Sequence, residues 1–369
     1  MNQNIQGRRN TLKFLALAGV TAVGGYALLE YAPWLNDTQS SDQTRRPLEQ
    51  NTSGTAQMRE LVRFAALAAS GHNTQPWKFK ILGNAIEIHP DFTRRLPAVD
   101  PNDRELWISL GAALENLLVA ARASGFAPEV TYPDSADVIR VRLTRDTQQA
   151  SPLLATILTR QNTRSVYDGQ PIQPNHLERL RAVTLEPGIS LQFRSSRSEL
   201  ETVLEYVNQG NLKQYADPAF LKELVQWVRF DKREALASLD GLYSRCSGNP
   251  AVPRWLGQMV VTGTKPQGQA DSDAKKLRSS SGAVIVTSAS DDKTAWVRVG
   301  QVYERLALEM TTLNIKSAFL NQPIEVSSVV GSFQSAMGLE KLLPQLLVRF
   351  GYADAMPQSQ RREIEQILL

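Results

Sequence analysis

The chain has 369 residues, of which 42% are hydrophobic and 21% charged, an ordinary composition for a globular protein. Its formal charge is only +4, and no stripe of Lys and Arg interleaved with aromatic residues occurs, so the sequence argues against nucleic-acid binding. Cys246 is the only cysteine, which excludes an intramolecular disulfide. The histidines lie far apart and no HExxH, CxxC or EF-hand motif occurs, so we expect no intrinsic metal site.

The N-terminal residues predict an export signal followed by a linker. Arg8 and Arg9 precede the uncharged stretch 14–29, which is shorter and less apolar than a typical membrane span and fits a signal peptide. The paired arginines resemble a twin-arginine signal. We therefore expect residues 1–32 to engage the twin-arginine export machinery and the protein to be periplasmic. An ordinary secretion signal, or a retained tether to the inner membrane, is the alternative. The polar stretch 33–55 predicts a flexible linker.

Beyond the linker, apolar periodicity and turn residues predict a series of helices and strands. In chain order they are helix 57–69, strands 77–82 and 85–88, helix 106–124, strand 137–143, helices 152–160 and 174–183, a mainly helical region 198–247, strand 282–286, helix 294–313 and strand 346–352. Gly83-Asn84 predicts a hairpin turn, and Asp217-Pro218 predicts a helix start. The stretch 250–281 is rich in Gly, Pro, Ser and Gln and predicts an insertion or lid.

The two long helices share a pattern that indicates an internal duplication. Four residues of the first recur in the second at one constant offset: Trp107, Gly111, Glu115 and Leu117 correspond to Trp296, Gly300, Glu304 and Leu306. The residues that end the helices, Gly125 and Asn314, keep the same offset, and both tolerate left-handed geometry. A glycine inside a helix costs about 1 kcal/mol relative to Ala, which close helix packing would justify. We therefore predict that the helices cross near Gly111 and Gly300.

Several motifs together resemble those of the nitroreductase-like flavoproteins, which bind FMN. SGHNTQPWKF (70–79) resembles their N-x-Q-P-W signature, and residues 106–125 resemble their long central helix. RQNTRSVYDGQPI (160–172) resembles the arginine-rich segment that contacts the flavin phosphate and ribityl chain. SAFLNQPIEV (317–326) resembles the loop that offers backbone N–H groups to the hydride-accepting nitrogen. RFGYADAMPQSQRR (349–362) resembles the C-terminal strand and the basic end that returns to the phosphate.

The resemblance covers roughly residues 57–365 and implies an α+β fold. It is closest to the Acg-like branch, in which two nitroreductase-like halves are fused in one chain. We expect halves at 56–145 and 146–369, each with a mainly antiparallel sheet flanked by helices, and an insertion or lid at 250–281. Such a pseudo-dimer could work as a monomer or as a homodimer.

A flat isoalloxazine ring needs apolar packing and a few hydrogen-bonding groups, and its phosphate needs cations. The resemblance implies that the cofactor is held by Asn73, Gln75, Pro76, Trp77, Lys78, Phe79, Arg160, Arg164, Ile324, Glu325, Arg361 and Arg362. In the alternative interpretations, Trp77 is a core aromatic, and Arg361 and Arg362 form a solvated tail. His72 is interpreted as a loop side chain bonded to backbone, and no residue is assigned a catalytic role.

The first half carries the N-x-Q-P-W motif and the second carries the arginine segment, so one complete site can form across the halves. We therefore predict one FMN per chain. The expected function is two-electron reduction of a planar acceptor, a nitroaromatic or quinone, with NAD(P)H or another small molecule as donor. Because NAD(P)H is scarce outside the cytoplasm, a non-catalytic protein that sequesters flavin under a lid is the main alternative. A structural relic without flavin is the third hypothesis.

Overall fold

The computed structural model describes residues 43–49, 52–132 and 137–369. The predicted export signal and most of the predicted linker lie outside the described residues. Residues 43–49 differ from the linker expectation, because Arg63 anchors them. Its guanidinium donates to the carbonyl oxygens of Thr44, Arg46 and Pro47 at 2.7, 2.8 and 3.1 Å. The folded part therefore begins earlier than the polar composition predicts.

The first sheet has the strand order β1-β2-β4-β3 with all neighbours antiparallel. Its strands are β1 (Trp77–Leu82), β2 (Ala85–Pro90), β3 (Phe126–Thr131) and β4 (Ile139–Arg145). The predicted hairpin is confirmed, with Leu82 paired to Ala85 around a left-handed Gly83. Residues alternate in burial along β1, so Trp77 and Phe79 enter the core formed with α3 (Gly54–Ala65) and α4 (Arg104–Ala123).

The second sheet has the order β5-β8-β10-β9 and is also antiparallel. Its strands are β5 (Ile189–Arg194), β8 (Gly282–Ser288), β9 (Lys316–Phe319) and β10 (Leu343–Gly351). Strand β8 is buried along its whole length, because helices cover both faces. One face meets α6 (Pro174–Arg181) and α12 (Lys293–Thr312). The other meets α7 (Arg197–Gln214), α11 (Pro266–Arg278), α13 (Gln322–Glu325) and α14 (Ser327–Ala336). The mixed α+β architecture with two antiparallel sheets agrees with the expected fold class.

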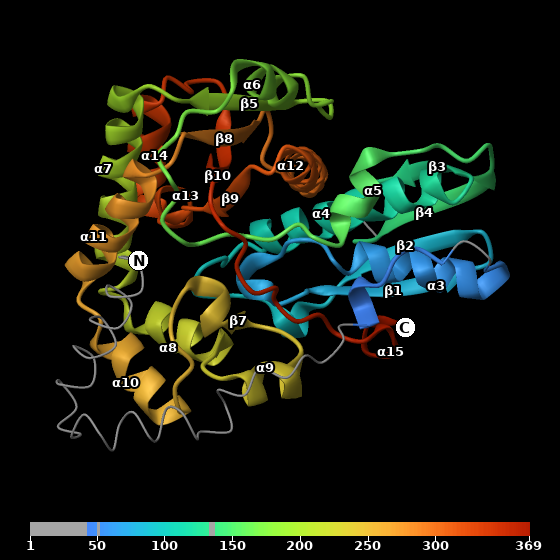
Figure 1. Cartoon of the computed structure of the whole chain (residues 1–369), viewed down its shortest axis with the longest axis horizontal. Helices are drawn as coiled ribbons and strands as arrows, with labels where there is room; N and C mark the ends of the chain where they lie inside the picture. Colours follow the sequence, from blue (N-terminus) through green and yellow to red (C-terminus); the bar gives the residue numbers. More distant parts are fainter. Residues whose placement is uncertain (1–42, 50–51, 133–136) are drawn as a thin grey trace, which may run out of the picture.

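Helices α4 and α12 pack against each other between the two sheets (Figure 1). The predicted crossing is confirmed at both glycines. A Cβ on Gly111 would overlap the carbonyl oxygen of Val297, and one on Gly300 would overlap that of Ile108. Gly125 and Asn314, which follow the helices, both have the predicted left-handed φ, of 77° and 56°. Duplication itself stays a prediction.

Both ends of the predicted second half reach back to the first. Ile157 of α5 (Pro152–Ile157) is part of the core under the first sheet. The C-terminal segment leaves β10 and crosses to the far side of the molecule, ending at α15 (Ile364–Ile367) (Figure 1). There the amide of Leu369 donates to the carbonyl of Phe79 at 2.8 Å. These two arms tie the halves together.

A further group of elements lies beside the junction of the two halves (Figure 1). It contains α8 (Pro218–Trp227), β6 (Val228–Arg229), α9 (Lys232–Ser238), β7 (Leu242–Tyr243) and α10 (Arg254–Gly263). The predicted start of α8 is confirmed, because the Asp217 carboxylate caps the amide of Ala219 at 2.8 Å. Residues 250–281, expected to be an insertion or lid, form α10, α11 and the first residues leading into β8.

One helix in the described ranges, α4, is long and apolar enough to cross a membrane by length and composition alone. Its apolar stretch is 94% buried inside the protein, as expected of a central core helix.

Candidate functional site

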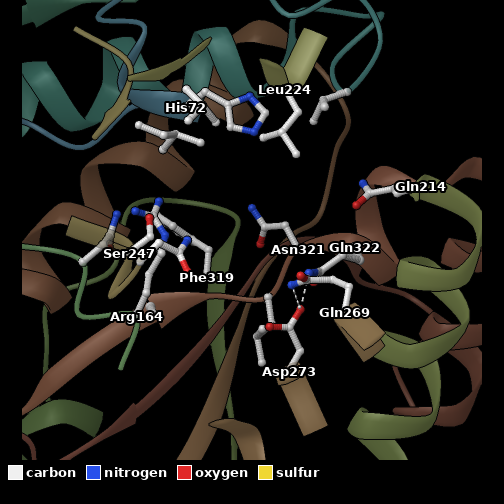
Figure 2. A pocket seen from close by; sticks show the side chains of 18 of the residues that line it. His72, Arg164, Gln214, Leu224, Ser247, Gln269, Asp273, Phe319, Asn321 and Gln322 are labelled. Carbon is white, nitrogen blue, oxygen red and sulfur yellow. Dashed lines mark hydrogen bonds between the residues drawn. The ribbon is translucent and has the colours of Figure 1, made fainter. Parts of the chain in front are cut away.

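A cavity of about 850 Å³ lies where the two halves meet the group of elements around α8 and α10. The first half contributes the loop Ala69–His72 and the side chain of Glu105. The second half contributes the segment 162–166 and the residues 318–322. In Figure 2, His72 and Leu224 of α8 lie on one side, and Arg164, Phe319 and Asn321 lie on the other. The volume falls within the range of small-molecule and cofactor sites.

The first wall is formed by a strained loop. His72 has a φ of 45°, a left-handed conformation that is uncommon for residues other than glycine. Its Nδ1 atom is buried and has no hydrogen-bond partner, so the predicted bond to backbone is absent at this nitrogen. Burial, and secondarily the nearby Arg164, lower the pKa of His72 to about 4. The imidazole is therefore neutral at pH 7 and offers an unused nitrogen beside the cavity.

The opposite wall holds the guanidinium of Arg164. It makes no hydrogen bond and no ion pair with any other residue that the structure describes, although burial lowers its pKa. Its backbone is held by Arg349, which donates to the carbonyl oxygens of Thr163 and Ser165 at 3.3 and 2.8 Å. Arg349 in turn stacks over the ring of Tyr167, 4.0 Å from the centroid. Arg164 is thus a cation with free donors on a backbone segment that Arg349 holds, and such a guanidinium can bind an anionic group.

A pair of carboxyl groups lines another part of the cavity. Glu105 accepts hydrogen bonds from Arg104 and Asn321, both at 3.2 Å, and Glu325 accepts one from Gln214 at 2.5 Å. Burial raises the pKa of Glu105 well above its usual range, and the neighbouring Glu325 raises it further. Burial also raises the pKa of Glu325.

The carboxamides of the N-x-Q-P-W motif point into the protein rather than line the cavity. Asn73 and Gln75 are buried and bridge two distant segments, 239–241 and 360–362. The amide of Asn73 donates to one carbonyl in each segment, at 3.1 and 3.2 Å. The Gln75 amide donates to the first segment at 2.8 Å and accepts from the second at 2.9 Å. These partners occupy the groups expected to meet a flavin edge, so their binding role stays a prediction.

Arg160 and Arg361 also have protein partners. Arg160 is buried and forms an ion pair with Glu304 at 2.8 Å. Arg361 donates to the side chain of Asn73 at 2.9 Å. Both guanidinium groups donate to the carbonyl oxygen of Leu67, at 3.1 and 3.2 Å. The motifs of the two predicted halves therefore do come together. The guanidinium groups of Arg160 and Arg361, however, bind protein groups and so connect the halves to each other.

The remaining predicted residues divide into core and peripheral positions. Trp77 and Phe79 are fully buried in the first core, which matches the alternative interpretation of Trp77. Lys78 donates to the carbonyl of Gln366 at 2.7 Å. Pro76 precedes β1, and its carbonyl oxygen accepts from the amide of Asp91 at 2.9 Å. Arg362 is buried and donates to the backbone of Gln75 and Gln366, at 3.3 and 2.8 Å. The interpretation of Arg361 and Arg362 as a solvated tail is wrong, because both are buried by these contacts.

The motif 317–326 is expected to offer backbone N–H groups to a cofactor, but the amides of its last residues, 324–326, already have backbone acceptors. Those residues form and end α13, a single helical turn. The amides of Ile324 and Glu325 donate to the carbonyl of Asn321 at 2.8 and 3.0 Å, and that of Val326 donates to Gln322 at 3.2 Å. The Ile324 side chain is buried in the core, whereas Glu325 lines the cavity.

Of the predicted cofactor residues, Arg164 and Glu325 line the cavity. Sequence reasoning included residues 70–72 in the conspicuous motif but gave His72 no binding role, and it missed Glu105 at the start of α4. The sequence feature that could have indicated the loop Ala69–His72 is Gly71. A Cβ there would lie 3.2 Å from Leu96 and 3.5 Å from an oxygen of Glu105.

No model of a protein family matches the chain. The chain is 26% identical over 326 residues to "Putative NAD(P)H nitroreductase Rv3131" of Mycobacterium tuberculosis H37Rv, covering 84% of this chain and 90% of the relative. It is 22% identical over 323 residues to "Putative NAD(P)H nitroreductase acg" of the same organism, covering 84% and 94%. A solved structure of the FMN-dependent nitroreductase NfnB from Mycobacterium smegmatis in complex with NADPH aligns with a TM-score of 0.38 and 13% identity, over 56% of this chain and 94% of that one. The curated relatives support the nitroreductase-like family that the motifs predicted.

Proposed function

We propose that this protein is an FMN-binding oxidoreductase of the nitroreductase type, which reduces a planar acceptor, a nitroaromatic or a quinone, by two electrons. The observation that carries the proposal is the unpaired guanidinium of Arg164 in a cavity of about 850 Å³ lined by both halves. The relatives named as NAD(P)H nitroreductases favour NAD(P)H as the electron donor.

The residues around the cavity fit a flavin nucleotide. Arg164 is a half-buried cation without a partner among the described residues, suited to the phosphate or to negative charge on the ring. The unused Nδ1 of His72 can bond a polar ring atom, and Phe319 and Leu224 offer apolar surface. A bound FMN would supply the hydride chemistry. The protein residues would bind and orient it, and the elements around α8 and α10 add apolar side chains to the cavity wall.

The experiment is reconstitution with FMN followed by titration of Arg164→Met. We expect the variant to bind FMN about 10- to 100-fold more weakly, because a charge-assisted hydrogen bond contributes about 1.5–3 kcal/mol. Arg197→Met is the matched control, because Arg197 is exposed on α7 and pairs with Glu201 at 2.8 Å, away from the cavity. Equal FMN affinity of the two variants would refute the assignment of Arg164, and more than one FMN per chain would refute the single site.

The sequestering alternative is favoured by one feature, the wall that α8 and α10 contribute to the cavity, which would serve as its cover. Val260 and Val261 of α10 line it, together with Phe220 and Leu224 of α8. If the cover stays closed, FMN would be retained but reduced slowly. Rapid bleaching of the bound FMN by NADPH, and its return on adding a quinone, would support the enzyme. Export by the twin-arginine route is a separate proposal, which rests on Arg8 and Arg9.

A further inference from the structure

The carboxyl pair at the cavity comes from two distant parts of the chain. Glu105 lies in the first turn of α4, and Glu325 is the last residue of α13. Both carboxyl groups line the same cavity, and the charge of Glu325 contributes to the raised pKa of Glu105. Asn321 donates to Glu105 and Gln214 donates to Glu325, and both donors line the cavity and are labelled in Figure 2.

The surrounding charges cannot neutralise two carboxylates. Arg104 on α4 is the cation that acts on both groups. Asp100, in the turn before α4, is a further anion that acts on both, and Asp103 acts on Asp100. The remaining partners, Asn321 and Gln214, are neutral. Two close carboxylates in a buried site raise each other's proton affinity, which favours one retained proton over two negative charges.

Both residues of the pair line the cavity that the proposed ligand would occupy. An oxygen of Glu105 is 3.5 Å from the position of a Cβ on Gly71, and Gly71 lines the same cavity. The next residue, His72, has a buried Nδ1 without a partner and lines the same cavity. A polar group of a ligand beside this loop would therefore meet an unpartnered imidazole nitrogen and a carboxyl proton.

We propose that Glu105 and Glu325 share one proton and donate it to the acceptor during its reduction. The inference rests on the proposed function, which supplies the hydride. Reduction of a quinone to its hydroquinone consumes one hydride and one proton. In the proton step, the carboxyl O–H bond breaks and an O–H bond forms on the acceptor oxygen. The pair is left as two carboxylates and regains a proton from water.

The first test measures protons and needs no flavin. The free energy of unfolding of the apoprotein is measured at several pH values near neutrality. Its slope with pH gives the number of protons that the protein releases when it unfolds. We expect Glu105→Gln and Glu325→Gln each to remove about one linked proton, and the double variant to remove no more than either. Glu205→Gln, exposed on α7, is the control and should change nothing. The proposal of a shared proton would be overturned if the double variant removed two linked protons, or if the single variants removed none.

The second test uses the FMN-loaded protein with two acceptors. Menadione needs a proton for its reduction, whereas ferricyanide takes electrons only. We expect Glu105→Gln to lower kcat for menadione about 100-fold, the lower end of general acid catalysis, while ferricyanide reduction changes less than about twofold. Parallel losses with both acceptors, or no loss with menadione, would overturn the donor role. A protein that binds no FMN would refute the proposed function, while the proton count still tests the pair.

Discussion

Replacing Gly300 by Ala is expected to lower the free energy of unfolding by about 3 kcal/mol or more, the upper range for overpacking a tight core. The new methyl group would lie closer than 3.0 Å to the backbone of α4, at Ile108, Gly111 and Ala112. Backbone inside a helix cannot move aside as a flexible side chain can, so α4 and α12 would have to separate. Both cores contact these helices, so the loss should appear as a lower midpoint of chemical unfolding.

The matched control is Gly331→Ala. Gly331 also lies inside a helix, α14, but it is exposed and a Cβ there would meet nothing within 4 Å. The same substitution should therefore stabilise the protein by up to about 1 kcal/mol, the difference in helix propensity between Gly and Ala. If Gly300→Ala were as well tolerated as Gly331→Ala, the helices would not pack as closely as the structure shows.

The helix crossing was predictable because glycines inside the two helices indicate it from the sequence alone. A glycine inside an apolar helix is locally unfavourable, so its presence at corresponding places in two helices implies a tertiary cause. The buried strand β8 and the hairpin of β1 and β2 were predictable for a similar reason, since apolar runs and a Gly83-Asn84 turn are local signals.

In the two four-stranded sheets, sequence analysis missed β3, β5 and β9. Each lies at the edge of its sheet. An edge strand pairs on one side only, and β3 and β5 have few fully buried residues, so their apolar pattern is weak. Strand β9 is only four residues long. Edge strands therefore form here mainly because a neighbouring strand offers hydrogen bonds, which local periodicity does not reveal.

The sequence predicted which segments come together at the site, but not which of their side chains are free to bind a ligand. Arg160 and Arg164 belong to one motif and have the same side chain, yet one is paired and the other is free. The difference lies in Glu304, which faces Arg160 from α12, more than a hundred positions along the chain. The partners of Asn73 and Gln75 are similarly remote in sequence. Local motif chemistry cannot distinguish a cofactor ligand from a residue whose partner arrives from elsewhere.

Arg160→Met is therefore expected to damage folding rather than cofactor binding alone. Its side chain is 3% exposed and that of Glu304 is 0% exposed, and the charged atoms lie 2.8 Å apart. Removing one partner of a buried ion pair typically costs about 3–5 kcal/mol, because the other charge is left without compensation. The matched control is Arg179→Met. Arg179 of α6 pairs at 2.6 Å with Glu309, which lies on α12 as Glu304 does. The Arg179 side chain is 52% exposed, so breaking this pair should cost less than about 1 kcal/mol.

The cost of Arg160→Met should also depend on pH. Burial already raises the pKa of Glu304, and Arg160 opposes that rise, so its removal raises the pKa further. The folded variant then keeps a proton on Glu304 that the unfolded chain loses above about pH 4.3. Because the folded state binds more protons, its stability falls as pH increases, by up to about 1.4 kcal/mol per pH unit until the raised pKa is reached. Unfolding measured at several pH values should show the smallest loss near pH 4 and a growing loss toward pH 8.

A second substitution tests whether the uncompensated carboxyl causes this loss. Arg160→Met combined with Glu304→Leu leaves two apolar side chains where the ion pair was, and such replacements are often neutral or stabilising. The double variant should therefore recover most of the lost stability and lose the added pH dependence. A double variant as unstable as Arg160→Met would show that the bond from Arg160 to the Leu67 carbonyl, not the ion pair, holds this part of the interface. Recovery would instead show that the ion pair between Arg160 and Glu304 connects α12 to the arginine segment. Arg160 would then have a structural role, whereas Arg164 of the same segment keeps its charge free in the cavity.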